Sequence, residues 1–341
     1  MILNKKHAYY QEDLNRVLSI EGLEALKGKR VLITGATGLI GVHLIDVLMR
    51  LEQVKIIAVG RNADNAKMRL GEYFDHPDFS FIEHDVLKPF PEELGADIVI
   101  PLASNTHPLA YSKYPVETIM INVKGAEHAL NLAKKCGATV LYPSSVEVYG
   151  NSDGQEPIRE GYTGSLNLSN ARACYTESKR VCEAMCQSYL AEYGVNTKIV
   201  RLSRVFGPTM LESDSKVSSQ FIRKAIAGED IVLKSEGKQF FSYIYVTDAV
   251  AAMLHVVNYG ELGSAYNISN EKCNVRLKDF ARICAGYAGK DIVFDLPTDV
   301  ESKGYSVAMN AVLDNTKLKT IGFTPMYGFS DAINRTIEIL R

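Results

Sequence analysis

Short apolar runs alternate with longer segments of helical periodicity over the first 200 residues of the chain. The runs predict buried strands at residues 30–34, 54–59, 79–82, 97–102, 139–142 and 198–202. The longer segments predict helices at residues 42–50, 123–135 and 177–193. A strand covered on both faces is apolar along its whole length, and such strands alternating with helices are typical of parallel βαβ units. The pattern therefore predicts an α/β fold built on a doubly wound parallel sheet.

A glycine-rich turn follows the first predicted strand. Residues 34–41 read TGATGLIG, so three glycines are spaced three apart at the start of a predicted helix. Glycines there permit a tight turn and let backbone N–H groups reach a pyrophosphate, which the helix N-terminus also attracts. The turn predicts a Rossmann-type site for NAD or NADP. Its expected cofactor-binding residues are Gly35, Thr37, Gly38, Leu39, Ile40 and Gly41.

The end of the second predicted strand bears on the choice between NAD and NADP. An acidic residue there binds the ribose 2′-hydroxyl of NAD, but this chain has Gly60-Arg61-Asn62. Arg61 either accepts a 2′-phosphate or is a solvated loop charge, and both interpretations stay open. Asp85 and Val86 follow the third strand, where an adenine contact is expected and a plain surface loop is the alternative.

The regular alternation ends near residue 204. The pattern beyond it predicts a helix at residues 218–227, a strand at 231–233 and further helices toward the C-terminus. We therefore expect a dinucleotide-binding domain at residues 1–203 and a smaller C-terminal substrate-binding domain at 204–341. A segment near residues 243–268 is expected to return to the first domain. Neither a repeat nor a Gly/Ser linker separates the two parts, so we expect them to pack closely.

Composition and charge exclude some classes of partner. The 341 residues include 38 basic and 40 acidic side chains, which leaves no broad basic surface for nucleic acid or an anionic membrane. No apolar stretch approaches the ~20 residues of a membrane helix, and the N-terminus lacks the apolar core of a signal peptide. The six cysteines are scattered without a CxxC pair, which favours buried thiols in a reducing cytoplasm over a metal site.

A tyrosine and a lysine are the first candidate catalytic pair. Tyr175 and Lys179 are four residues apart, which places both on one face of a predicted helix. A phenol with a pKa near ~10 is a poor base at neutral pH. An adjacent ammonium, with a cationic nicotinamide close by, lowers that pKa by favouring the phenolate. Ser145 and Glu147 lie about thirty residues earlier at the end of a strand, and supply a hydroxyl and a carboxylate.

The glycine turn, the serine and the tyrosine–lysine pair have the order and spacing of the extended short-chain dehydrogenase/reductases. Further segments resemble the UDP-glucuronate decarboxylase branch of the sugar-nucleotide epimerase/dehydratase family, and the similarity runs from about Lys29 to the C-terminus. These segments are residues 100–104, 122–125, 145–150, 172–180, 206–208, 216–221, 245–248 and 313–318.

The resemblance implies a division of labour. Tyr175 is the expected base for the sugar 4-hydroxyl, Lys179 holds the nicotinamide ribose, Ser145 hydrogen-bonds the reacting oxygen and Glu147 faces the substrate. A 4-keto sugar forms transiently, and with a C6 carboxylate it is a β-keto acid that loses carbon dioxide. NAD is recycled rather than consumed. The resemblance further implies a homodimer and cofactor contacts at Leu102, Ala103, Ser104 and Asn122.

The chain departs from the family pattern at four positions. Val146 replaces an aspartate of the dehydratases, which argues against 4,6-dehydration. Lys216 replaces an arginine that helps to protonate the carbanion. Arg204 replaces an asparagine, and Phe241 replaces an arginine that meets the diphosphate. Arg204 either supplies the lost charge or forms an ion pair within the fold, and the alternative interpretation of Phe240 and Phe241 is that both are core residues. The residues expected around the substrate are Ser104, Tyr111–Tyr114, Glu147, Arg204, Lys216 and Gln220.

The expected function is that of an enzyme that modifies a nucleotide-linked sugar by transient oxidation at C4. The cofactor is expected to be NAD, with NADP as the alternative. UDP-glucuronate decarboxylation is the favoured activity, and a 4-epimerase or a 4-keto-sugar reductase is the rival within the class. A catalytically silent dinucleotide-binding regulatory module is the rival from another class, but such modules typically lose the tyrosine or the lysine that this chain retains at 175 and 179.

Overall fold

A seven-stranded parallel sheet forms the centre of the molecule. The structure, a computed structural model, describes residues 3–106, 108–154, 156–296 and 310–341. The sheet strands are β1 (Arg30–Thr34), β2 (Lys55–Gly60), β3 (Phe79–Glu83), β4 (Ile98–Pro101), β5 (Thr139–Ser145), β6 (Thr197–Leu202) and β10 (Ala265–Ile268). Their order is β10-β6-β5-β4-β1-β2-β3, and each pairing is parallel. The prediction of a doubly wound parallel sheet is confirmed.

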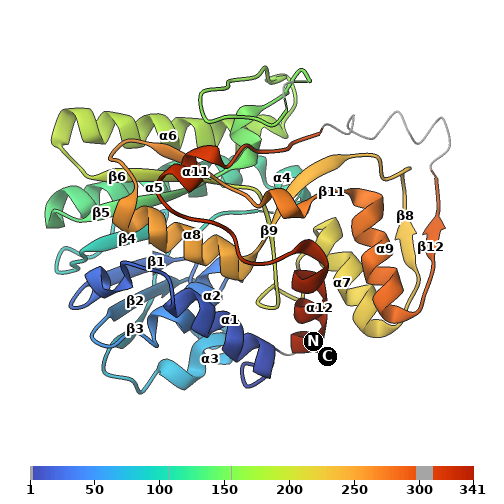
Figure 1. The fold of residues 1–341 in the computed structure, drawn as a ribbon. Coiled ribbons are helices and arrows are strands. Elements are labelled where there is room, and N and C mark those ends of the chain that lie inside the picture. The colour runs from blue at the N-terminus through green and yellow to red at the C-terminus, as the bar shows by residue number, and fades with distance from the viewer. Residues whose placement is uncertain (1–2, 107, 155, 297–309) are drawn as a thin grey trace.

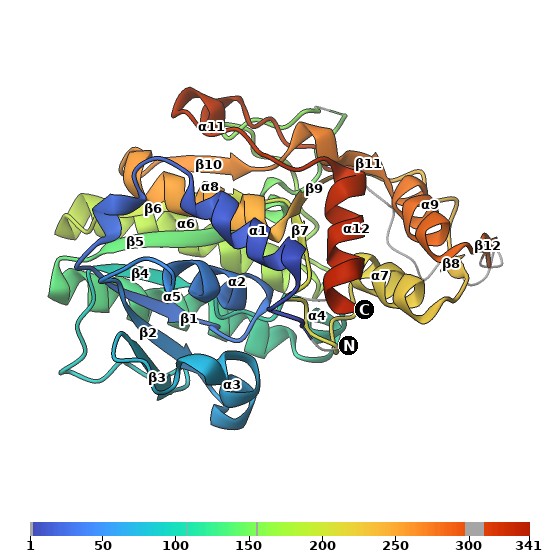
Figure 2. The same ribbon diagram turned by 60° about the horizontal axis from the view of Figure 1, so that its bottom comes forward.

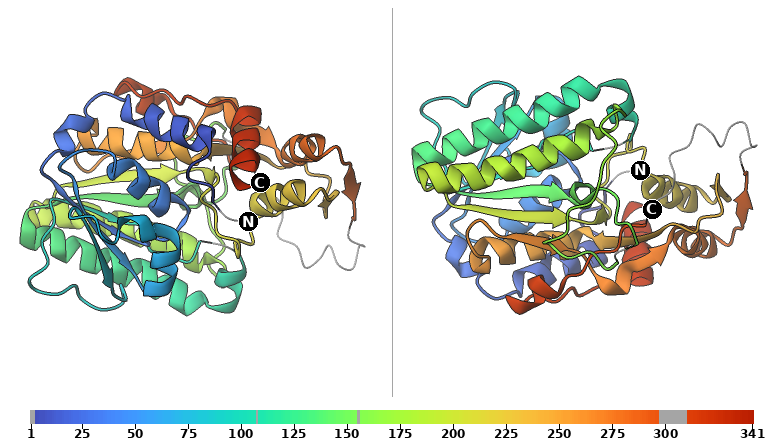
Figure 3. Two further views of the ribbon diagram at one scale, coloured as in Figure 1. Left: turned by 90° about the horizontal axis from the view of Figure 1, so that it is seen from below. Right: turned by 90° about the horizontal axis from the view of Figure 1, so that it is seen from above.

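Helices cover both faces of this sheet (Figures 1 and 3). Helices α5 (Pro115–Cys136) and α6 (Ala173–Tyr193) pack together on one face. Helices α1 (Ala8–Leu18), α2 (Leu39–Leu48) and α8 (Val246–Tyr259) pack together on the other. The connection from β2 to β3 contains α3 (Ala63–Leu70).

The apolar runs of the sequence are explained by burial on both faces. Val31 and Ile33 of β1 belong to the core that contains residues of α2 and α8. Leu32, between them, belongs to the separate core beneath α5 and α6. Successive side chains of a strand point to opposite faces, so a two-sided core requires every position of β1 to be apolar.

Helices α2, α5 and α6 all begin earlier than the sequence pattern predicts, α5 at Pro115 rather than at residue 123. Helix α2 begins at Leu39, directly after the glycine turn, and α6 begins at Ala173 rather than at Glu177. Helix α5 begins with Pro115 and ends before Gly137, whose φ of 67° is left-handed. Proline at the first position and glycine after the last are the usual helix boundaries, because neither interrupts an internal hydrogen bond there.

The C-terminal half contains smaller elements at one end of the main sheet (Figures 1 and 2). Its strands are β7 (Arg204–Phe206), β8 (Ile231–Leu233), β9 (Phe240–Tyr245), β11 (Asn274–Arg276) and β12 (Ile292–Phe294). Its helices are α7 (Val217–Ala227), α9 (Leu277–Ala288) and α12 (Phe329–Leu340). The short helix α11 (Thr316–Thr320) lies instead beside β10 of the main sheet (Figure 2). β9 lies between β11 and β7 in a three-stranded sheet, and β8 pairs with β12. The expected boundary near residue 203 stays a prediction.

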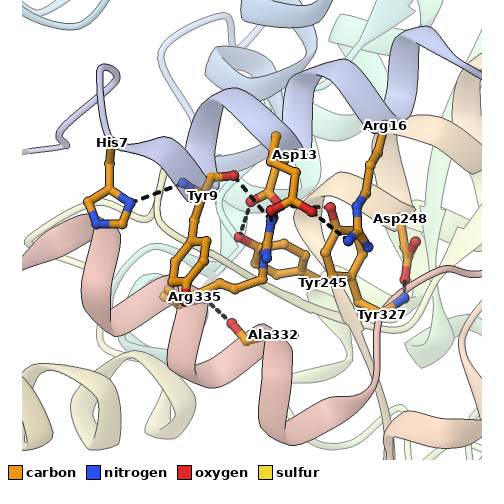
Figure 4. A network of polar contacts seen from close by, with 11 residues as sticks. His7, Tyr9, Asp13, Arg16, Tyr245, Asp248, Tyr327, Ala332 and Arg335 are labelled. Atoms are coloured by element: carbon orange, nitrogen blue, oxygen red, sulfur yellow. Dashed lines mark hydrogen bonds and ion pairs between the residues drawn. The ribbon is translucent and has the colours of Figure 1, made fainter.

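A buried acid ties the first helix to the C-terminal part (Figure 4). Asp13 of α1 accepts hydrogen bonds from Tyr245 Oη at 2.6 Å and Tyr327 Oη at 2.7 Å. Arg335 of α12 donates to it from Nε at 2.9 Å and pairs with Glu12 at 2.8 Å. A buried carboxylate is costly without such partners, so this network fixes how α1 and α12 sit against β9.

Candidate active site

The glycine turn lies against the chain that follows β4. Gly35 has a φ of +63°, and a Cβ there would lie 2.8 Å from the backbone nitrogen of Ala103. A Cβ on Gly41 would lie 2.6 Å from the carbonyl oxygen of Gly35. Ala103 N donates to Thr34 Oγ1 at 3.1 Å, which fixes this approach. The turn therefore meets Ala103 and its neighbour Leu102 at the carboxyl ends of β1 and β4.

The same place is the switch point of the sheet, because β1 has β2 on one side and β4 on the other. Open α/β sheets bind dinucleotides at such a point. The side-chain-free cradle at Gly35 and Gly41 fits a pyrophosphate, since a Cβ at either position would already collide with backbone.

The residues expected near the adenosine lie at the ends of β2 and β3. Arg61 is exposed, and its Nη1 is 3.6 Å from Glu117 Oε1. Asp85 Oδ1 accepts a hydrogen bond from Leu87 N at 3.0 Å. Val86 is buried. An exposed ion pair is weak, so the contact with Glu117 does not commit Arg61 to a structural role.

Hydrogen bonds link the end of β4 to α6 through α5. Ser104 Oγ donates to Asn122 Oδ1 at 2.7 Å, and Asn122 Nδ2 donates to Ser178 Oγ at 2.8 Å. Ser178 Oγ donates in turn to the carbonyl of Tyr175 at 2.8 Å. This uncharged chain joins two expected cofactor residues, Ser104 and Asn122, to the backbone that carries the candidate base.

Tyr175 and Lys179 are both buried on α6. Lys179 Nζ donates to the carbonyl of Pro143 at 2.7 Å and lies 5.9 Å from the centre of the Tyr175 ring. Burial lowers the pKa of Lys179 to about 8. Burial and the charge of Glu147 raise the pKa of Tyr175, and a hydrogen bond with Ser145 opposes that rise. In the chain by itself burial outweighs the polar neighbours. The expected depression of the Tyr175 pKa also requires the positive charge of the nicotinamide, so it stays a prediction.

Ser145 and Glu147 form the first turn after β5. Ser145 Oγ accepts a hydrogen bond from Glu147 N at 3.2 Å. Glu147 Oε2 accepts one from Thr176 Oγ1 at 3.4 Å, and Arg172 Nη2 lies 4.0 Å from Glu147 Oε1. The start of α6 thus holds the Glu147 carboxylate beside Tyr175.

A cleft of about 1320 Å³ opens beside these residues. Its lining includes Glu147, Arg172, Thr176, Arg204, Gln220, Lys224, Val232, Phe241 and Leu296. Gln220 also donates from Nε2 to the carbonyl of Ser215 at 2.7 Å. Lys216 does not line the described wall of the cleft, and its Nζ is 3.3 Å from Asp214 Oδ2. The structure therefore brings Glu147, Arg204 and Gln220 to one cleft and directs the Lys216 amine to Asp214.

Arg204 in the cleft wall has an aromatic partner. Its guanidinium carbon lies 3.6 Å from the centre of the Phe241 ring. Its Nη1 atom is buried without a hydrogen-bond partner, and no carboxylate of the described residues is within ion-pair distance of it. Burial lowers the pKa of this guanidinium, against the opposing effects of Tyr243 and Glu147. The alternative of a structural ion pair thus has no partner in the described part of the chain.

Residues 31–269 match the model of the NAD dependent epimerase/dehydratase family. The chain belongs to this family. The family assignment confirms the resemblance seen in the turn at residues 34–41 and in the Tyr175–Lys179 pair. It also agrees with the cradle at Gly35 and Gly41, which fits a dinucleotide.

Relatives within the family include proteins named UDP-glucuronic acid decarboxylase. Decarboxylase 1 of Xenopus tropicalis is 32% identical over 314 residues, which cover 92% of this chain and 72% of the relative. Decarboxylase 6 of Arabidopsis thaliana is 36% identical over 241 residues, which cover 71% of this chain and 69% of the relative. The predicted resemblance to the decarboxylase branch is confirmed.

Solved structures of the family share the fold. The UDP-glucose 4-epimerase of Thermotoga maritima, solved with UDP-glucose, superposes with a TM-score of 0.76 at 20% identity, covering 91% of this chain and 98% of that one. A dTDP-glucose 4,6-dehydratase of Streptomyces venezuelae, solved with NAD, gives 0.77 at 21% identity, covering 91% and 96%. At such identities the likeness shows the architecture alone.

The structure gives Tyr111 a specific contact, and it adds two residues, Arg172 and Thr176, that the sequence did not predict at the site. Tyr111 stacks on Tyr175 with ring centres 4.8 Å apart, whereas Tyr114 is exposed. Arg172 and Thr176 flank Tyr175 in sequence and reach Glu147. Their closeness to Tyr175 in the sequence is the feature that could have predicted them.

The described residues contain neither a metal-binding cluster nor a membrane-spanning helix. Within residues 3–106, 108–154, 156–296 and 310–341, no group of three or more His, Cys, Asp or Glu side chains is arranged to hold a metal ion. In the same ranges none of the helices combines the length and the apolar character needed to cross a bilayer.

Proposed function

We propose that this chain decarboxylates UDP-glucuronate by oxidising the sugar transiently at C4. One observation carries the proposal: Glu147 and Thr176, which contact each other beside the buried Tyr175, line a cleft that also contains Arg204. The cleft thus combines Glu147, which lies beside the candidate base, with a cation suited to a nucleotide diphosphate. The relatives named UDP-glucuronic acid decarboxylase support the choice of sugar.

The cofactor belongs at the switch point of the sheet, and NAD is the form we propose. The turn at Gly35–Gly41 would hold its pyrophosphate, and Lys179 would hold the nicotinamide ribose. When bound, NAD would supply reversible hydride transfer at C4 of the sugar. Leu102, Ala103, Ser104 and Asn122 would border it, since the turn at Gly35 meets Ala103. Because Arg61 is exposed and only loosely paired, NADP stays the alternative.

The proton chemistry falls to Tyr175. Its phenolate would take the proton of the sugar 4-hydroxyl, and Ser145 would donate a hydrogen bond to the same oxygen. The Tyr175 phenol resists ionisation in the chain alone, so positive charge near it is needed before it acts as a base. Lys179 supplies such a charge below a pH of about 8.

Loss of carbon dioxide follows from the ketone. With the ketone at C4, the C6 carboxylate is β to it, and the electrons of the C5–C6 bond pass to the ketone oxygen as carbon dioxide leaves. A proton must then be delivered to C5. Lys216 is the proposed donor, and it has to leave Asp214, to which its amine is paired at 3.3 Å, in order to reach the sugar. Glu147 and Gln220 complete the proposed substrate contacts from the cleft wall.

A panel of UDP-, CDP- and dTDP-linked sugars tests the function. Purified protein with NAD should convert UDP-glucuronate to a product lighter by the mass of carbon dioxide and leave the other sugars unchanged. A product of unchanged mass and altered stereochemistry at C4 would indicate an epimerase instead. Binding of NAD without conversion of any sugar would indicate the regulatory module.

We also propose a homodimer built on α5 and α6, which lie side by side on one face of the sheet (Figure 3). Val116, Ile119 and Met120 of α5 and Val181 of α6 are exposed. Apolar side chains gathered on neighbouring helices favour burial against a second copy. Light scattering should give twice the mass of one chain, and Met120→Glu should yield monomers; a monomeric wild type would refute the dimer.

A reducing compartment such as the cytoplasm is the proposed location. All six cysteines are unpaired, and five of them are buried. Free buried thiols persist where disulfides do not form.

A further inference from the structure

We propose that Phe241 is a positioning residue, whose ring holds the Arg204 guanidinium ready for the substrate diphosphate. This inference rests on the proposed function, because it names how the same cleft binds its nucleotide. Phe241 stands where the resemblance places an arginine, so the aromatic ring would support the relocated charge instead of supplying one.

The strand register places both side chains on one face of the three-stranded sheet. Arg204 of β7 is paired with Tyr243 of β9, and Phe241 lies two residues before Tyr243 on the same strand. Side chains two residues apart on a strand share a face, and diagonal neighbours on adjacent strands are within reach of long side chains. The guanidinium lies 3.6 Å from the Phe241 ring centre, and the Tyr243 ring meets that ring edge-on at 6.3 Å.

None of the described residues compensates the charge of Arg204. Its Nη1 is buried without a hydrogen-bond partner, and no acid of the described residues pairs with it. A guanidinium stays charged at any ordinary pH, and a buried charge without a counter-ion is unfavourable. Stacking on an aromatic face offsets part of that cost and leaves the N–H donors at the edge of the plane unoccupied. A diphosphate is the anion that such donors fit, since arginine binds phosphate oxygens in pairs.

Both members of the pair line the cleft, whereas the adjacent Phe240 does not. Phe240 alternates to the opposite face of β9 and is half-buried like Phe241. The chain therefore contains a matched control for the ring: the same residue type, on the same strand, facing away from Arg204.

Calorimetry with UDP and with uridine tests the proposal. Phe241→Leu removes the ring and keeps an apolar side chain, so UDP should bind about tenfold more weakly while uridine binds as before. Arg204→Ala should weaken UDP binding at least as much. Combined with Arg204→Ala, the Phe241→Leu change should cost nothing further, because it acts through the guanidinium. Phe240→Leu should leave both ligands unaffected, and Phe241→Tyr, which keeps a ring, should preserve UDP binding if Phe241→Leu fails to fold.

Two results would overturn this positioning role while leaving the proposed function intact. In the first, Phe241→Leu binds UDP as strongly as the wild type while Arg204→Ala does not bind it. The Phe241 ring would then only fill space in the core. The other is an equal loss of UDP and uridine, which would indicate a loosened cleft. If wild-type protein binds NAD but neither UDP nor UDP-glucuronate, the proposed function fails, and the positioning role fails with it.

Discussion

The polar groups behind Tyr175 and those in the wall of the cleft differ in whether the chain itself supplies their hydrogen-bond partners. Behind Tyr175, Ser104, Asn122 and Ser178 are joined by hydrogen bonds of 2.7–2.8 Å that need no ligand. In the wall, Arg204 has an aromatic ring beside it and no acid of the described residues as a partner. The first region is complete within the chain, and it carries the proposed base. The second contains a cation that, under the proposed function, the diphosphate of the substrate completes.

The largest effect is expected in the first region, at the candidate base. Tyr175→Phe removes only the proton acceptor, so turnover should fall by at least about a hundredfold while NAD binding stays near the wild-type level. Tyr193→Phe is the matched control, because Tyr193 is exposed at the far end of the same helix and the variant should retain full activity. Steady-state rates and NAD titrations measure both; substantial turnover by Tyr175→Phe would mean that another group takes the proton.

The next effect concerns Lys179 and pH. Burial lowers the pKa of this amine to about 8, so its positive charge is present below that pH and is lost as the pH rises through it. Turnover should therefore decline above a pH of about 8, and Lys179→Ala should impair both NAD binding and turnover. The pH dependence of kcat measures the first effect. A rate that stays flat well above this pH would show that the ammonium is not needed.

A smaller effect is expected in the second region. Arg204→Ala removes charge-assisted hydrogen bonds worth roughly 1.5–3 kcal/mol each. The Kd for UDP-glucuronate should rise by about one to two orders of magnitude, and the difference should shrink at high salt. The melting temperature should change little, because no ion pair of the described residues is broken. A clear fall in melting temperature, with no UDP-sugar bound by either form, would instead assign Arg204 to the fold.

The smallest effect is expected at the edge of the cofactor site. Arg61 is exposed and 3.6 Å from Glu117, so Arg61→Ala should weaken NADP binding a few-fold and leave NAD binding unchanged. Dissociation constants for both cofactors, in wild type and variant, measure the ratio. An unaltered ratio would identify Arg61 as a surface charge only.

The features that depend on local sequence were predictable. The uninterrupted apolar run of β1 follows from burial on both faces, with Val31 and Leu32 in different cores. The turn at Gly35 was predictable because its positive φ and its contact with Ala103 require glycine. The beginning of α2 was placed three residues late, since its first turn contains a glycine and no regular apolar spacing.

The features that depend on which strands pair were not predictable. Arg204 and Phe241 are 37 positions apart in the sequence. Their stacking depends on the register of β7 against β9, which no local pattern encodes. Lys216 pairs with Asp214, only two residues away, whereas the family resemblance predicts that Lys216 contacts the substrate. The rise in the Tyr175 pKa within the chain itself was not predictable either, because its largest cause is burial, a property of the folded chain.

The central claim is that C4 of the sugar is oxidised and then reduced again on one enzyme molecule. UDP-glucuronate labelled with deuterium at C4 tests it directly when the product is analysed by mass and NMR. The account predicts a UDP-linked pentose that keeps the deuterium at C4, takes a solvent hydrogen at C5 and forms without net reduction of NAD. Loss of the label from C4, or release of reduced cofactor in proportion to product, would contradict it.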